Sequence, residues 1–248
     1  MGSVIAGFVL VLLVLTLIFR KKESTVKDIV VDITHLTDEN SDFIKEKDIK
    51  EIVKRAFDAD LSFAKVGQVD VKRVESILER DPFIENAEVF IDAASNLQIK
   101  ITQREPILRV VDNNGLNYYL DKNGFRMPLS KYFSARVPIV TGAVAPHVND
   151  FLQRKKYGLK DVFLLVQRLN ADAFFAPMVQ QIVVDAAGEF TLVPILGDQI
   201  IRIGTIDDLD EKLERLKVFY KQAMPYEGWQ TYRSISVKYK NQIVCKKY

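Results

Sequence analysis

The pattern of apolar and polar positions separates a short N-terminal segment from the rest of the chain. Residues 4–19 are almost continuously apolar, and the run ends abruptly at the basic residues 20–22. A helix rises about 1.5 Å per residue, so a segment of this length just reaches across a hydrocarbon layer of ~30 Å. The pattern predicts a transmembrane anchor over residues 1–22. A cleaved signal peptide is the alternative, but no basic stretch precedes the run and no small-x-small cleavage site follows it.

The spacing of apolar residues changes along residues 23–106 in an order that predicts strand, helix, helix, strand, strand. Alternation indicates strands, and apolar residues at i, i+3, i+4 and i+7 indicate amphipathic helices. The predicted elements are a strand in residues 26–34, a helix in residues 43–57, a helix capped by Asp70 and stopped by Pro82, and hairpin strands in residues 87–91 and 97–101. We expect Leu97, Ile99 and Ile101 to face the helices as buried core.

Residues 107–248 have the pattern of short strands, turns and two helices. Asn-Gly pairs at residues 114–115 and 123–124 are turn signals. Strands are predicted in residues 116–120, 137–140, 181–185, 189–193, 199–203, 234–239 and 242–248, and helices in residues 161–169 and from Asp208, with Glu211 completing a capping box, to Pro225. The predicted fold class is α+β, with helices packed on an antiparallel sheet in this second domain.

Composition narrows the class of protein. The chain is 48% hydrophobic with a net charge of +2, and neither a long block of like charge nor a basic patch interleaved with aromatics occurs. Disorder and nucleic-acid binding are therefore not expected. About 225 residues after the anchor suffice for two domains with real cores. The single cysteine rules out an internal disulfide, which still allows an oxidising compartment.

The residues that carry catalysis in other proteins are scattered here. His35 and His147 lie far apart in loop-like surroundings, so a metal site is not expected. Cys245 lies in a terminal strand, where a thiol is usually a small apolar filler. Asp207 and Asp208 precede a helix, where capping explains them. No phosphate loop, Gly-x-Ser-x-Gly or His-Glu-x-x-His motif is present. We expect no catalytic residues, no cofactor and no enzyme.

Several segments in the first domain resemble the POTRA domain of the bacterial FtsQ and DivIB division family. Residues 81–89 read Asp-Pro-Phe-Ile-Glu-Asn-Ala-Glu-Val, residues 96–99 read Asn-Leu-Gln-Ile and residues 104–107 read Arg-Glu-Pro-Ile. The second domain is similar to the β domain of the same family. Its matching residues are 121–124 ahead of Pro128 and Leu129, 203–204 with Leu209 and Lys212, and 235–239. The resemblance covers the anchor (1–22), the POTRA domain (23–106) and the β domain (107–248).

The resemblance implies a single-pass protein of the cell inner membrane at the division septum, with its soluble domains in the periplasm. The basic residues 20–22 argue weakly for the opposite orientation, because positive charge favours the cytoplasmic side. The implied function is a non-enzymatic scaffold of the divisome. It recruits the coiled-coil membrane proteins FtsB and FtsL, called DivIC and FtsL in many lineages, and through them the septal peptidoglycan synthase.

The last predicted strand, residues 242–248, leaves a sheet edge whose backbone groups must be protected or used. Lysines on an edge are a known guard against aggregation, so Lys246 and Lys247 allow a purely protective role. In FtsQ-like proteins the C-terminal strands of the β domain receive the partners, which implies strand addition here. The partner-binding residues expected on this basis are Ser234, Ser236, Lys238, Tyr239, Gln242, Ile243, Val244, Cys245, Lys246, Lys247 and Tyr248.

Two other classes of protein remain as alternatives. A POTRA-containing transport or outer-membrane biogenesis component would chaperone polypeptide strands by the same edge pairing, and it predicts tandem POTRA repeats or a following β-barrel, neither of which is found in the sequence pattern. A peptidoglycan hydrolase would need a constellation of carboxylates or metal ligands, which the sequence lacks.

Overall fold

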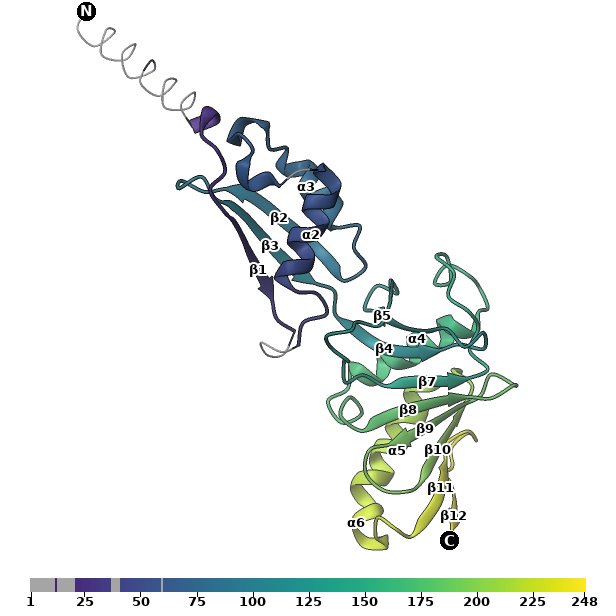
Figure 1. The fold of residues 1–248 in the computed structure, drawn as a ribbon. Helices are drawn as coiled ribbons and strands as arrows, with labels where there is room; N and C mark the ends of the chain where they lie inside the picture. Colours follow the sequence, from purple (N-terminus) through teal and green to yellow (C-terminus); the bar gives the residue numbers. More distant parts are fainter. Residues whose placement is uncertain (1–11, 13–20, 37–40, 59) are drawn as a thin grey trace, which may run out of the picture. The chain divides into compact units, whose positions relative to one another are not determined.

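The computed structural model of the chain describes Leu12 and residues 21–36, 41–58 and 60–248. It forms two compact units (Figure 1). The first contains Met1–Arg104 and also Ser130–Ser134, and the second contains Glu105–Leu129 and Ala135–Tyr248. The anchor expected over residues 1–22 falls almost wholly outside the described part of the chain. Within that part, no helix is long and apolar enough to cross a membrane.

The first unit has the order of elements that the sequence predicts. Its elements are β1 (Ile29–Thr34), α2 (Glu46–Phe57), the 3-10 turns η1 (Leu61–Phe63) and η2 (Val66–Gln68), α3 (Val71–Leu78), β2 (Ile84–Ile91) and β3 (Leu97–Gln103). The sheet order is β1-β3-β2, with β1 parallel and β2 antiparallel to the central strand β3. Strand, helix, helix, strand, strand is therefore confirmed.

The core of the first unit lies where the sequence places it. Leu97, Ile99 and Ile101 are buried to within 1% of full burial, and they pack with apolar residues of α2 and α3. The predicted cap of α3 is also present, because Asp70 Oδ1 accepts a hydrogen bond from the Arg73 backbone N–H at 3.1 Å. The alternation of β3 and the cap of α3 therefore agree with the predicted core.

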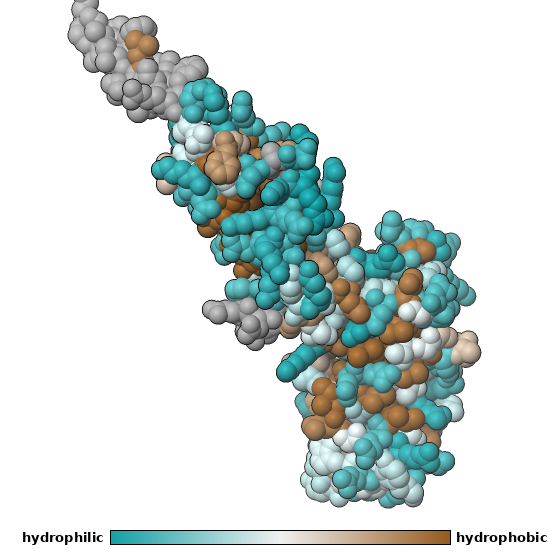
Figure 2. Space-filling view, viewed as in Figure 1, coloured by the Kyte–Doolittle hydropathy of each residue, from teal (hydrophilic) through white to brown (hydrophobic). Residues whose placement is uncertain are grey.

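The second unit is built on one nine-stranded sheet. Its strands are β4 (Pro106–Val111), β5 (Asn117–Asp121), β6 (Arg126–Met127), β7 (Ile139–Gly142), β8 (Val179–Val184), β9 (Phe190–Pro194), β10 (Ile200–Gly204), β11 (Tyr232–Ser236) and β12 (Val244–Lys247). They lie in the order β12-β11-β10-β9-β8-β7-β4-β5-β6. The helices α4 (Gly158–Asn170) and α5 (Leu209–Gln222) cover one face (Figure 1). Figure 2 shows apolar side chains gathered on the other face, among polar ones.

The expected antiparallel sheet is in fact mixed. The pairs β4 with β7, β7 with β8, and β10 with β11 are parallel. Parallel neighbours need a long crossover, and the chain supplies one each time. The β5–β6 hairpin separates β4 from β7, α4 separates β7 from β8, and α5 separates β10 from β11. The sequence pattern predicts β7, β8, β10 and β11 but not β4, and it does not give the order of the strands in the sheet.

The predicted ends of the late helix are wrong in two respects. Asp208 does precede α5, but it has a left-handed backbone (φ 51°) and its side chain makes no capping hydrogen bond. A residue that caps a helix with its side chain usually has a β-region backbone, and the positive φ of Asp208 departs from it. Pro225 does not close α5, which ends at Gln222; it lies instead in the first turn of a further short helix, α6 (Met224–Glu227), where a missing N–H does no harm.

Candidate partner-binding edge

The strand β12 forms one end of the nine-stranded sheet and, among the residues that the structure describes, pairs with β11 alone. The two strands are antiparallel, with Ile235 opposite Cys245 and Ser236 opposite Val244. The outer backbone edge of β12 is left with unpaired N–H and C=O groups. Such an edge is a template onto which a further strand can add.

The side chains of this last segment alternate between the core and solvent. Ile243 and Cys245 pack against the hydrophobic core, whereas Val244 is 47% exposed and Tyr248 is 73% exposed. Burial, assisted by the negative charge of Glu227, raises the pKa of the Cys245 thiol. A protonated and half-buried thiol is a poor nucleophile, so Cys245 has the environment of a core side chain.

The two lysines of β12 differ in their surroundings. Lys247 Nζ lies 3.4 Å from Glu227 Oε2 and 5.6 Å from the centroid of the Tyr232 ring. Lys246 is exposed and forms no ion pair with any residue in the described part of the chain. The positive charge available to an incoming acidic partner is therefore concentrated at Lys246.

An arginine of α5 holds the connection between β11 and β12. Arg215 donates from one terminal nitrogen to Val237 O at 3.2 Å and to Tyr239 O at 3.3 Å. In the same connection Lys238 forms an ion pair with Glu189 of the β9 approach, and this hydrogen bond raises the pKa of Lys238. These contacts help to position β12, although the residues that make them lie outside this strand. Sequence reasoning missed Arg215, because on a helical period it is merely an exposed neighbour of the buried Leu216.

Aromatic side chains pack where α5 meets the last strands of the sheet. The rings of Phe219 on α5 and Tyr232 on β11 have centroids 5.8 Å apart, and those of Tyr220 and Trp229 are 6.0 Å apart. Gln199 Nε2 donates to the Tyr220 hydroxyl at 3.1 Å. Burial raises the pKa of Tyr220, so the hydroxyl stays neutral and able to share this hydrogen bond. The last strands of the sheet therefore pack against a layer of aromatic side chains.

The residues expected to bind a partner all lie on the final strand pair or its connection. Ser234 and Ser236 are half-buried on β11, Lys238, Tyr239 and Gln242 are exposed in the connection, and the remaining expected residues follow from Ile243 to the end of β12 and Tyr248. Tyr239 is 50% exposed. The fold thus brings these residues together on the edge strand β12, its neighbour β11 and the connection between them.

The two histidines occupy separate units and have ordinary partners. His35 Nδ1 lies 2.9 Å from Asp42 Oδ1, and His147 Nε2 lies 3.2 Å from Gly124 O. Burial lowers the pKa of His147. In the described ranges, no group of three His, Cys, Asp or Glu side chains could hold a metal ion.

Comparison with known proteins covers both units. Residues 105–246 match the family described as "FtsQ/DivIB, C-terminal related", and residues 25–102 match the POTRA-like domain. The chain is similar to the cell division protein FtsQ of Geobacter sp. (strain M21), with 28% identity over 182 residues, 73% of this chain and 65% of the relative.

It is also similar to FtsQ of Rhodothermus marinus, with 25% identity over 75% of this chain and 68% of the relative. FtsQ of Syntrophotalea carbinolica is 26% identical over 62% of this chain and 55% of the relative. The chain thus matches between about half and two thirds of the length of these relatives. Because the match to the C-terminal family covers more than half of the chain, and because a POTRA-like domain precedes it, the chain belongs to the FtsQ/DivIB family.

Proposed function

We propose that this chain is a cell division protein that acts as a non-enzymatic scaffold of the divisome. Its relatives carry the name cell division protein FtsQ, which supports the process. The scaffold role is inferred from the type of site that the second unit presents: a sheet edge, two lysines and exposed apolar side chains.

The partners would be FtsB, or DivIC, and FtsL, and through them the septal peptidoglycan synthase. The observation that carries this proposal is the position of β12 at the end of the sheet, with one neighbouring strand and a free outer edge. A strand of the partner would pair with the backbone of β12 and would gain most of its affinity from main-chain hydrogen bonds. Val244 and Tyr248 would supply apolar contacts, and Lys246 would attract acidic residues.

The proposed location is the cell inner membrane at the septum, with both units in the periplasm. The apolar run in residues 4–19 would be the anchor. A partner that is itself anchored in the same membrane would then meet β12 on the same side, which is the arrangement that strand addition requires.

Proline substitutions in β12 test the proposed pairing, because proline removes a backbone N–H without changing charge. One of Val244 and Cys245 has its N–H turned towards β11 and the other has it turned outward. We expect Val244→Pro and Cys245→Pro to behave differently: one should lose the soluble FtsB–FtsL complex and stay folded, and the other should destabilise the second unit. Binding is measured by titration with the full chain, with thermal melts in parallel.

Charge reversal gives the matched test. Lys246→Glu should weaken association more than Lys247→Glu, because Lys247 already has Glu227 as a partner. The effect should fall mainly on the association rate and shrink with added salt. If all four variants stay folded and bind like the parent, β12 is only the lysine-guarded end of the sheet, and the partner binds elsewhere.

A further inference from the structure

A loop of the first unit, residues 60–66, is joined to the segment that follows the apolar run of residues 4–19. Thr25 and Lys65 form an antiparallel bridge between the two. Backbone hydrogen bonds of 2.8 Å and 2.9 Å flank this bridge. The 60–66 loop is therefore fixed to the chain only a few residues after the apolar run ends.

Further contacts hold the same segment of the chain on both sides. Lys65 of the 60–66 loop forms an ion pair with Glu23. In the turn between β2 and β3, Ser95 O accepts a hydrogen bond from Lys27 N at 3.0 Å, and Ser95 Oγ lies 3.2 Å from Ser24 Oγ. The segment, the loop and the turn therefore form one end of the first unit.

The 60–66 loop exposes a phenylalanine at this end. Phe63 is 82% exposed, more than any other large apolar side chain in the described part of the first unit, whereas Leu61 is buried. The Asp60 carboxylate accepts a hydrogen bond from Ser62 N at 3.0 Å. Ala64 N donates to Leu61 O, also at 3.0 Å. These hydrogen bonds fix the turn η1, which directs Leu61 into the core and Phe63 into solvent.

The position of Phe63 indicates which surface could cover it. A single exposed apolar side chain is ordinary on a protein, but the loop that carries Phe63 is joined to the chain directly after the apolar run. If that run crosses the membrane, as proposed above, the bilayer surface lies at this end of the first unit. Lys21 and Lys22 are exposed there as well. Basic and aromatic side chains together are typical of segments that lie at lipid headgroups.

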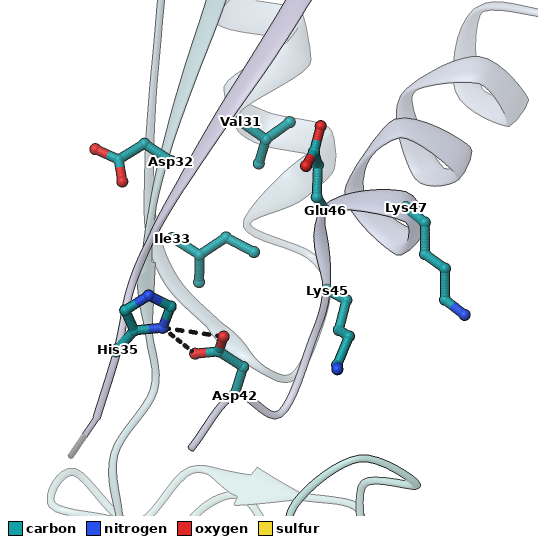
Figure 3. A pocket seen from close by; sticks show the side chains of 8 residues that line it. All are labelled: Val31, Asp32, Ile33, His35, Asp42, Lys45, Glu46 and Lys47. Carbon is teal, nitrogen blue, oxygen red and sulfur yellow. Dashed lines mark hydrogen bonds and ion pairs between the residues drawn. The ribbon is translucent and has the colours of Figure 1, made fainter. Parts of the chain in front are cut away.

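The opposite end of the first unit has a polar surface. A cavity of about 510 Å³ lies there beside the start of α2, and its lining includes His35, Asp42 and Lys47 (Figure 3). Figure 3 shows His35 and Asp42 turned towards each other, with a distance of 2.9 Å between Nδ1 and Oδ1. A helix rises about 1.5 Å per residue, so α2 separates Lys47 from the 60–66 loop by roughly 15 Å. Lys47 is therefore a suitable reference position away from the loop.

We propose that the 60–66 loop binds the surface of the membrane in which the chain is anchored, with the Phe63 ring inserted among the lipid headgroups. The ring would be covered by the upper parts of the acyl chains, and the ammonium groups of Lys21 and Lys22 would stay at the level of the lipid phosphates. This contact gives the first unit a second point of attachment besides the chain itself, and so limits how far the unit can tilt on the membrane. The inference rests on the proposed membrane anchor and is independent of the proposed role of β12.

Quenching of tryptophan emission by brominated lipids tests the proposal in the full chain. Trp229 is the single tryptophan of the sequence, so Trp229→Phe provides a background without tryptophan emission. The chain is reconstituted in vesicles of phosphatidylcholine and phosphatidylglycerol. Lipid brominated near the glycerol end of its acyl chains should quench Phe63→Trp at least about twofold more than lipid brominated near the chain ends, because the proposed depth of the ring is shallow.

Two further positions in the same background separate the loop from the anchor and from the rest of the unit. Leu12 lies in the middle of the apolar run, so Leu12→Trp should be quenched more by the lipid brominated near the chain ends. Lys47→Trp, at the end of the unit that holds the cavity, should be quenched by neither lipid. Thermal melts of Phe63→Trp and Lys47→Trp should match that of the background, because both side chains are exposed.

Trypsin provides a second measurement, which needs no tryptophan. It cleaves after Lys21 and Lys22, and a loop bound to the membrane keeps this part of the chain close to the lipid. In vesicles, Phe63→Ser should release the fragment that follows the cleavage site roughly threefold or more faster than the parent. Phe90→Ser is the matched control, because it removes another exposed phenylalanine of the first unit, and it should leave the rate of release unchanged.

Four results would overturn the proposal. Quenching of Leu12→Trp without quenching of Phe63→Trp would show that the anchor crosses the membrane but the loop does not bind it. Absence of quenching at both positions would refute the anchor and this inference together. Equal quenching of Phe63→Trp and Lys47→Trp would show that the unit lies on the lipid without preference for the loop. Equal rates of fragment release from Phe63→Ser and Phe90→Ser would show that Phe63 does not hold the unit on the membrane.

Discussion

Replacing Ile99 by aspartate should unfold the first unit and leave the second intact. Ile99 lies on the central strand β3, is 0% exposed, and faces Val31 on one side and Val89 on the other. Removing its side chain from the core forfeits about 1.5 to 3 kcal/mol of burial. An aspartate there would also place a carboxylate among apolar neighbours without a partner, which costs at least several kcal/mol.

The sum is roughly 5 kcal/mol or more, against a typical domain stability of about 5 to 15 kcal/mol. A unit of this size lies towards the lower end of that range, so the variant should not fold. Ile99→Val is the control and should lose only about 0.5 to 1.5 kcal/mol. Calorimetry of the full chain should show the transition of the first unit lost in Ile99→Asp and only shifted in Ile99→Val. Retention of every parent transition in Ile99→Asp would refute the assignment of β3 as the core strand.

Four further predictions concern the second unit and the anchor. Arg215→Met should lose roughly 1 to 2 kcal/mol of stability and speed amide exchange in β12, because two hydrogen bonds to the preceding connection disappear. Gly142→Ala should destabilise the sheet by more than about 1 kcal/mol in urea unfolding, since Gly142 has φ +99° and a Cβ there would lie 2.1 Å from Val184 O. Burial lowers the pKa of His147 in the folded chain. Below about pH 6.5 the unfolded chain therefore takes up a proton more readily than the folded chain, and the free energy of unfolding decreases as the pH falls. Between pH 7 and pH 5 the melting temperature of His147→Gln should therefore drop by less than that of the parent. Alkaline phosphatase fused after Tyr248 should be active if the units are periplasmic, whereas an inactive fusion with an active cytoplasmic reporter would reverse the topology.

The first unit was predictable because its local signals agree with its fold. The period-2 alternation of β3, the Asp70 cap and the short hairpin all act within a few residues, and each appears in the structure as expected. In the second unit most elements were predictable, but β4, β6, α6 and the order of the strands were not. The pairing of β10 with β11 joins segments separated by α5 and α6, and periodicity carries no information about which strands become neighbours.

The candidate site, too, could be predicted from the sequence only in part. The last strand and its lysines are visible in the sequence, because they follow from alternation and from position. The ion pair of Lys247 with Glu227 and the hydrogen bonds from Arg215 are not visible, because each joins residues about twenty positions apart through the tertiary fold. The same holds for Tyr132, which reaches Asp48 across 84 positions.

Amide hydrogen exchange of β12, with and without the soluble FtsB–FtsL complex, shows whether the partner pairs with the backbone of this strand. It reads the backbone groups that strand addition would use and does not depend on any substitution. If a partner strand adds to β12, outward amides within Val244–Lys247 exchange quickly in the free full chain and become strongly protected in the complex, while those of the opposite edge strand β6 are unchanged. Unchanged exchange throughout β12 in a saturated complex would contradict this pairing.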